Sequence, residues 1–288
     1  MNYFLFVVVL YNTSISQSLT MRSLLEKRDL LKARGIRISV VDNTPGIKPE
    51  TLFLQNEIQC IAFGENRGVA KAYQFAYQVA KQDKFRFLVL LDQDSEITHE
   101  FIYALDEIVD DHDLPIAVWC PNVLSCGKPI SPYSLSFMGW PNFSPRSDAD
   151  RLYGINSFSV VNMKFIESIG GFNTFYWLDC LDLWLYERAR QTDWKVVRLN
   201  TSVKHDLSLV SGEISLARLK SIAYFEACFV VEFGTIARIA GTIFRLGLRG
   251  IKRKKHIGGA YNYLLYFTDV LRGINTGLKR RCDKCSLR

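Results

Sequence analysis

The chain has 288 residues, of which 48% are hydrophobic and 23% are charged. This composition excludes a disordered chain, and the length allows one large domain with a smaller extension. The formal net charge is +7, and the basic excess lies towards the C-terminus, which predicts an anionic partner surface. No nucleic-acid-binding motif accompanies it, so we expect no nucleic acid partner. The seven scattered cysteines predict a reducing compartment, not a disulfide framework.

Strands and helices are predicted to alternate through the first half of the chain. Residues 4–10 are continuously apolar and lack the basic start and cleavage site of a signal peptide, so they predict a first buried strand. The elements predicted to follow are a helix at 19–34, strands at 36–41 and 58–63, a helix at 69–81, a strand at 87–91 and a helix at 100–109. This order predicts an α/β fold with a doubly wound, mostly parallel sheet and helices on both faces.

The pattern changes in the second half of the chain. Residues 120–154 contain five prolines and predict loops or a hairpin over the sheet edge. The elements predicted next are a strand at 158–161, a helix at 164–169, a helix through 178–188 and a strand at 196–199. Beyond residue 208 the sequence becomes helical and basic. We therefore predict a domain at 1–208 and a helical, basic extension at 209–288.

An Asp-x-Asp motif follows the strand predicted at 87–91. Asp92 and Asp94 stand where this strand ends, and ligands of such sheets bind at the carboxyl ends of the strands. Two converging carboxylates suit a hard divalent cation that also takes diphosphate oxygens as ligands. The alternative is a pair of ordinary acids at a solvated strand end.

Three more polar groups follow predicted strands. They are Tyr11-Asn12, Asp42-Asn43 and Asn66-Arg67-Gly68. Because right-handed crossovers bring the carboxyl ends of parallel strands to one side, these groups would line one rim together with Asp92. Each of them taken alone is equally explained as a turn, since Asn, Asp and Gly favour turns.

In this order, the motifs resemble those of family 2 glycosyltransferases, and among them bacterial rhamnosyltransferase-like members. The resemblance covers roughly residues 4–205. The matching segments are Val9-Leu10-Tyr11-Asn12, Val40-Val41-Asp42-Asn43, Asn66-Arg67-Gly68-Val69-Ala70, Leu91-Asp92-Gln93-Asp94-Ser95, and Gly170-Gly171-Phe172 followed by two acids. The resemblance implies a GT-A fold and metal-dependent transfer of a sugar from a nucleotide-diphospho-sugar with inversion at the anomeric carbon.

The resemblance also implies roles for individual residues. The implied donor-nucleotide residues are Tyr11, Asn12, Asp42, Asn43, Asn66, Gly68 and Asp92. The implied metal ligands are Asp94, Asp92 and His205. The cation would be Mn²⁺ or Mg²⁺, and imidazole suits Mn²⁺ better. The alternative for His205 is a hydrogen-bonded loop residue.

Two acids compete for the role of catalytic base. Asp182 matches the position of the base in the family, and Asp179 matches an acid one turn earlier. In the predicted helix, the i, i+3 spacing would place both on one face, where repulsion raises one pKa. We take Asp182 as the base and Asp179 as its support, the alternative being an acid that only favours a helix N-terminus. Trp177 and Trp184 are candidates for acceptor contacts, although many relatives have an acid at position 184.

The resemblance and the charge together suggest the setting. The leading donor is dTDP-rhamnose, and the leading acceptor is a lipid-linked oligosaccharide of bacterial O-antigen or capsule synthesis. Residues 215–255 combine an apolar helical face with basic residues, which predicts peripheral attachment to the anionic inner face of the cell membrane from the cytoplasm. The alternative for this segment is a helical cap packed on the catalytic domain.

Three other functions compete with this one. The first is the same chemistry with a UDP-hexose donor. The second is a nucleotidyltransferase, which also uses paired acids and a metal but usually has a Gly-rich loop after its first strand, where this chain has Tyr11-Asn12-Thr13-Ser14. The third is a nucleotide-sugar-binding module without catalysis.

Overall fold

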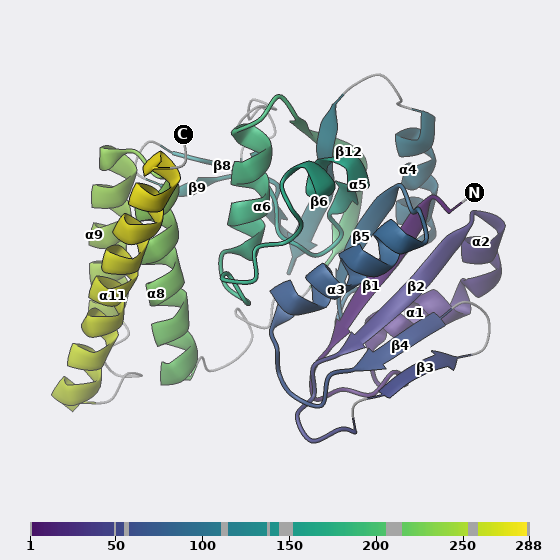
Figure 1. Cartoon of the computed structure of the whole chain (residues 1–288), viewed down its shortest axis with the longest axis horizontal. Coiled ribbons are helices and arrows are strands. Elements are labelled where there is room, and N and C mark those ends of the chain that lie inside the picture. Colours follow the sequence, from purple (N-terminus) through teal and green to yellow (C-terminus); the bar gives the residue numbers. More distant parts are fainter. Residues whose placement is uncertain are drawn as a thin grey trace. The chain divides into compact units, whose positions relative to one another are not determined.

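A computed structural model of the chain describes residues 2–48, 50–54, 58–110, 115–136, 139–143, 152–205, 215–252 and 259–286. The chain forms two compact units (Figure 1). The first consists of residues 1–133 and 145–207, and the second of residues 134–144 and 208–288. Residues 134–144, which precede the predicted boundary at residue 208, thus group with the C-terminal helices.

The first unit is built on a mixed, mostly parallel sheet. Its strands are β1 (Phe4–Leu10), β2 (Ile36–Asp42), β3 (Glu50–Leu54), β4 (Ile58–Ala62), β5 (Phe87–Asp92), β6 (Ile116–Ser125), β7 (Lys128–Ser131), β11 (Val160–Asn162) and β12 (Lys195–Lys204). Their order is β12-β6-β11-β5-β1-β2-β4-β3, and β7 pairs with β6. The pairs β1–β2, β1–β5, β2–β4 and β6–β12 are parallel, whereas β11, β3 and β7 run antiparallel to their neighbours.

The central strand β1 positions the functional edge of the sheet. All seven of its residues are buried, as a continuously apolar strand covered on both faces requires. In the parallel register, Leu10 of β1 pairs with Asp42 of β2, and Val9 pairs with Asp92 of β5. Polar residues at the carboxyl ends of three neighbouring strands therefore meet at one edge.

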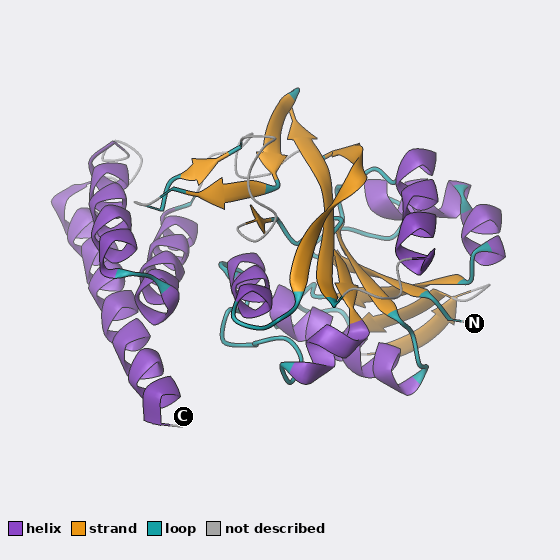
Figure 2. Cartoon of the chain, turned by 90° about the horizontal axis from the view of Figure 1, so that it is seen from above, coloured by secondary structure: helices purple, strands orange, loops and turns teal. Residues whose placement is uncertain are grey.

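Helices cover both faces of this sheet (Figure 2). They are α1 (Leu19–Glu26), α2 (Arg28–Ala33), α3 (Val69–Gln82), α4 (His99–Asp110), α5 (Met163–Ser168) and α6 (Leu181–Arg190). Apolar side chains of α1, α2 and α4 share one core with the strands, while α3, α5 and α6 contact the strands outside that cluster. The α/β fold predicted from the alternating pattern is confirmed.

Three local predictions differ from the structure. The helix expected at 19–34 is two helices, because the chain departs from helical geometry at Lys27. The edge strand β3 was not predicted. The proline-rich segment begins inside the ten-residue strand β6. Pro121 has no N–H to donate, and the register between β6 and β12 shifts beside it, between Arg198 and Ser202.

The second unit consists mainly of the helices α8 (Leu216–Phe233), α9 (Ile236–Lys252) and α11 (Gly259–Ser286). The short strands β8 (Tyr133–Leu135) and β9 (Pro141–Asn142) pair with each other. Gly273 and Gly277 let α11 approach α8 closely, because a Cβ at either would collide with backbone carbonyls of α8. In the part of the chain that the structure describes, no helix combines the length and the hydropathy that a membrane span requires.

Candidate active site

The loop after β5 is fixed by hydrogen bonds from two other segments. The N-terminal turn of α1 supplies the Ser18 and Thr20 hydroxyls, which donate to the carbonyls of Gln93 (2.7 Å) and Asp92 (2.5 Å). The backbone N–H of Tyr11 donates to the Gln93 side chain at 2.8 Å. Gln93, the middle residue of the acidic motif, is therefore held by hydrogen bonds through both its carbonyl and its side chain, which fixes the loop that carries the two acids.

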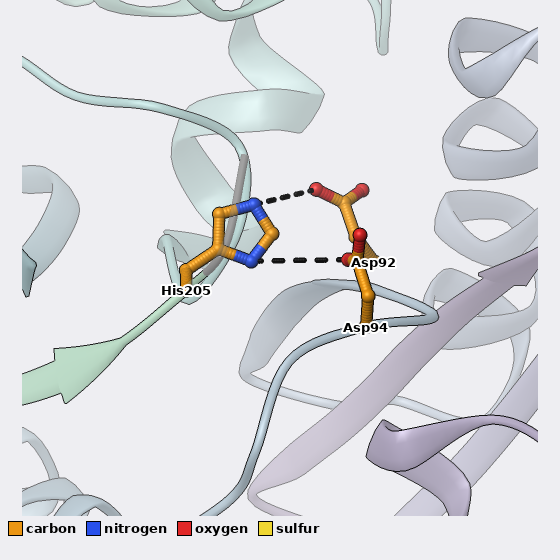
Figure 3. A group of neighbouring side chains, drawn as sticks. All are labelled: Asp92, Asp94 and His205. Atoms are coloured by element: carbon orange, nitrogen blue, oxygen red, sulfur yellow. Dashed lines mark ion pairs between the residues drawn. The ribbon is translucent and has the colours of Figure 1, made fainter. Parts of the chain in front are cut away.

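Asp92 and Asp94 converge on His205 (Figure 3). Nε2 of His205 lies 3.7 Å from Oδ2 of Asp92, and Nδ1 lies 3.8 Å from Oδ1 of Asp94. The histidine follows β12 directly, where its N–H donates to the Leu124 carbonyl and its backbone bridges to Ser95. One ligand atom from each of the three residues lies within 4.8 Å of the others. Two carboxylates and an imidazole so close together fit a divalent cation.

Two serines orient this cluster. Ser157 donates to Oδ2 of Asp92 at 2.6 Å, and Oγ of Ser95 lies 3.1 Å from Nδ1 of His205. The two serine hydroxyls are themselves 3.4 Å apart. His205 is buried, whereas the Asp92 and Asp94 side chains are 39% and 44% exposed. The protein thus fixes the cluster through the two serines and the buried histidine, while the two carboxylates remain accessible to solvent. Ser157 carries no sequence signal that predicts this contact.

An open hollow lies beside the carboxyl ends of β1 and β2. Its volume is about 690 Å³, and it is lined by residues 12–17 together with Leu25, Asp42, Thr44 and Ile47. Thr44 joins its two sides: its Oγ1 accepts from the N–H of Asn12 and its N–H donates to Asp42, both at 2.8 Å. Of the predicted nucleotide residues, Asn12 and Asp42 therefore line a hollow, and Tyr11 beside them is exposed.

The other predicted nucleotide residues shape the loop before α3. The buried Asn43 amide donates to the Gly68 carbonyl at 3.1 Å, and the Asn66 side chain accepts from the Gly68 N–H at 3.0 Å. Gly68 has φ +79°, and a Cβ there would lie 2.5 Å from the ring and the carbonyl of Trp177. A glycine is therefore required at this position. The Asn43 side chain is thus buried and hydrogen-bonded within the protein, whereas Asn66 is exposed.

The two candidate bases do not share a helix face. Helix α6 begins at Leu181, and Cys180 before it has a left-handed backbone with φ +62°. Asp179 therefore lies outside the helix, and the prediction that both acids occupy one helical face is wrong. The two acids nevertheless interact. Burial, and after it the negative charges of Asp179 and Asp92, raises the pKa of Asp182 to about 6. The N–H of Leu183 donates to Asp182 and offsets part of this rise.

The two tryptophans differ in their surroundings. Trp177 is partly exposed, and its carbonyl accepts from the N–H of Ala70 at 3.0 Å. Its ring lies against Gly68, so it joins the start of α3 to the segment before α6. Trp184 in α6 is only 5% exposed and offers a sugar far less ring surface.

Comparison with known families shows which family this is. The model of the family Glycosyl transferase family 2 matches residues 6–167, more than half of the chain. The chain belongs to glycosyl transferase family 2. The family predicted from the order of the motifs is confirmed, and with it the prediction of a glycosyltransferase. Comparison with curated protein sequences gives no match.

Two solved complexes of S. aureus TarS 1-349 share the fold of this family 2 chain. It is similar to S. aureus TarS 1-349 in complex with UDP-GlcNAc, with a TM-score of 0.55 and 12% identity over 97% of this chain and 82% of that chain. The complex of TarS 1-349 with UDP gives a TM-score of 0.51 and 12% identity over 99% and 92%. The mannosyltransferase PcManGT from Pyrobaculum calidifontis gives 0.48 and 11% identity over 97% and 86%. The chain spans 43% of a longer TarS chain.

Proposed function

We propose that this family 2 glycosyltransferase moves a sugar from a nucleotide-diphospho-sugar to an acceptor hydroxyl, with inversion at the anomeric carbon. The observation that carries the proposal is the cluster of Asp92, Asp94 and His205 at the strand edge that also bears the hollow. A divalent cation, Mn²⁺ or Mg²⁺, would be held by these three residues and would offset the charge of the departing diphosphate. The imidazole ligand favours Mn²⁺.

Asp182 is the proposed base. A pKa of about 6 leaves the carboxylate ionised at neutral pH and keeps it a stronger base than an ordinary Asp. As the acceptor oxygen forms its bond to the anomeric carbon, Asp182 takes the hydroxyl proton, and the bond from that carbon to the diphosphate oxygen breaks. Asp179 supports Asp182 through its charge.

The donor nucleoside is proposed to occupy the hollow lined by Asn12, Asp42 and Thr44. These side chains offer donors and acceptors that suit a base or a ribose. The form of the Asp92–Ser95 motif resembles rhamnosyltransferases, which makes dTDP-rhamnose the leading donor. A UDP-hexose is the alternative, and the likeness to TarS bound to UDP-GlcNAc motivates its inclusion in any test.

The proposed acceptor is a lipid-linked oligosaccharide of bacterial surface polysaccharide synthesis, met at the cytoplasmic face of the membrane. Helix α9 supports this setting. Its spacing places three exposed apolar residues on one side of the helix. They are Ile236, Phe244 and Ile251, which are 87%, 60% and 60% exposed. The exposed Lys252 follows them. Apolar and basic side chains together on one helix suit an anionic lipid surface. The basic residues 253–255 lie outside the described residues.

Turnover with a panel of nucleotide sugars and lipid-linked acceptors tests this proposal. Transfer that needs Mn²⁺ or Mg²⁺ and stops in Asp182→Asn would support it. Binding without any turnover would instead favour a nucleotide-sugar-binding module, and release of pyrophosphate from a nucleoside triphosphate and a sugar phosphate would favour a nucleotidyltransferase. Sedimentation with anionic vesicles tests the setting: binding should weaken as salt screens the charges, and Phe244→Ser should weaken it further.

A further inference from the structure

Helix α11 carries a row of exposed leucines at every seventh position. They are Leu264, Leu271 and Leu278, which are 62%, 64% and 51% exposed. Seven residues make almost two complete helical turns, so the three side chains project from one side of the helix. A row of exposed leucines along one side of a helix is the pattern of a surface that makes contact with another apolar surface.

The neighbours of α11 show which way this leucine row points. Gly273 and Gly277 face α8, because a Cβ at either would collide with backbone carbonyls of α8. Tyr266 faces α9, since its hydroxyl donates to the Leu246 carbonyl at 3.0 Å and its ring lies beside Gly250. Each residue advances by about 100° round a helix. Round the axis of α11, the side that faces α8 is therefore followed by the side that faces α9, and then by the leucine row.

The exposed apolar side chains of α9 point the same way. Arg249 of α9 donates to Glu226 of α8 at 3.1 Å, and the next residue, Gly250, lies against α11. Ile251 follows about 100° further round the helix, and the other two exposed apolar residues of α9 share its side. The order round α9 is thus again α8, the neighbouring helix and the apolar side chains. Both rows lie on one face of the α9–α11 pair, opposite α8 (Figure 1).

The charge of the helical unit favours one kind of partner for this face. Residues 208–288 contain fifteen Lys and Arg but only five Asp and Glu, whereas residues 1–207 contain 21 and 24. On α11, the exposed Arg272 and Lys279 border the leucine row. A second copy packed on this face would bring these cations towards their own kind, whereas anionic headgroups would attract them. Apolar side chains bordered by basic ones are typical of a helix that lies in a membrane interface.

We propose that the α9–α11 face enters the interfacial region of an anionic lipid bilayer, with both helices lying along the membrane surface. The inference rests on the proposed membrane setting, and it assigns the lipid contact to α11 as well as to α9. Leu264 and Leu278 are separated by about 21 Å along the helix axis. Two neighbouring rows of this length fix the orientation of the unit on the bilayer, which a single helix free to roll about its axis does not.

Vesicle sedimentation compares the wild type with Leu271→Ser and Leu271→Trp, on vesicles of equal parts phosphatidylglycerol and phosphatidylcholine. Leu271→Ser should lower the partition coefficient about three- to tenfold, because one leucine side chain no longer leaves water. The loss should persist at high salt, which screens charges and leaves apolar contacts in place. Leu271→Trp should bind more tightly, since an indole suits the interface, and its fluorescence should shift to shorter wavelength. Tyr103→Ser is the matched control: Tyr103 is 50% exposed on α4 of the first unit, and its loss should not change the partition.

Two further measurements separate lipid contact from other roles of the face. The melting temperature of Leu271→Ser should equal that of the wild type, because the side chain is exposed. Equal vesicle binding by the wild type and both Leu271 variants would overturn the inference. A wild-type dimer in sedimentation velocity that Leu271→Ser dissociates would also overturn it and assign the face to a second copy. A wild type that ignores anionic vesicles at low salt would refute the proposed membrane setting and this inference with it, while transfer to a soluble acceptor tests the proposed chemistry independently.

Discussion

Asp182→Asn should stabilise the protein while it abolishes efficient transfer. The substitution keeps the shape of the side chain and an oxygen for the Leu183 N–H, but it removes a charge that burial disfavours. The pKa of Asp182 is raised from 3.8 to about 6, a rise of roughly two units. At 1.36 kcal/mol per unit, the ionised carboxylate costs about 3 kcal/mol of stability.

The pH dependence follows from the direction of this shift. Because the pKa is higher in the folded state, the folded chain binds more protons than the unfolded chain between pH 3.8 and about 6. Stability therefore falls as pH rises through this window, and the full cost is present above about pH 7. Urea denaturation should show Asp182→Asn more stable than the wild type at pH 8, with a much smaller difference at pH 4.

The same residue should control the rate. Wild-type turnover should rise with pH through about 6 and level off as Asp182 ionises. In Asp182→Asn it should fall by roughly 10² or more and lose this dependence. Asp179→Asn is the matched control, with the same change in an acid three residues away. A larger loss at the chemical step in Asp179→Asn would show that the base is the other carboxylate. A less stable Asp182→Asn at pH 8 would refute the burial argument.

Four further substitutions test the architecture of the site. Asp94→Ala should abolish Mn²⁺-dependent binding of the nucleoside diphosphate with the fold intact, and unchanged affinity in calorimetry would exclude Asp94 as a ligand. Ser157→Ala removes the hydrogen bond to Asp92 and should weaken Mn²⁺ affinity about tenfold or more, whereas Ser95→Ala tests the histidine side in the same titration. Gly68→Ala combines positive φ with a collision against Trp177, so it should lower the free energy of unfolding by about 2 kcal/mol or more; an unchanged denaturation midpoint would contradict the geometry.

The parts of the site that were predictable are those with a local signal. The strand before Asp92 is continuously apolar, and strand topology predicts that Asp92 and Asp94 lie at the edge of the sheet where ligands bind. The break before α6 was not predictable in this way, because the left-handed residue is Cys180, and nothing in a cysteine indicates positive φ. Ser157 acquires its place through contacts with residues distant in the sequence, which no local pattern encodes.

The cluster in Figure 3 also brings together residues from an inner strand and from the end of a terminal strand of the sheet. Asp92 comes from β5 beside the central strand, whereas His205 follows β12, which ends the strand order and pairs with β6 alone among the described strands. Terminal strands open first in native-state fluctuations, because they have fewer hydrogen-bonded neighbours. A cation bound by these residues would link β12, the last strand in the order, to β5 in the middle of the sheet. Amide exchange in β12 should then slow when Mn²⁺ is added.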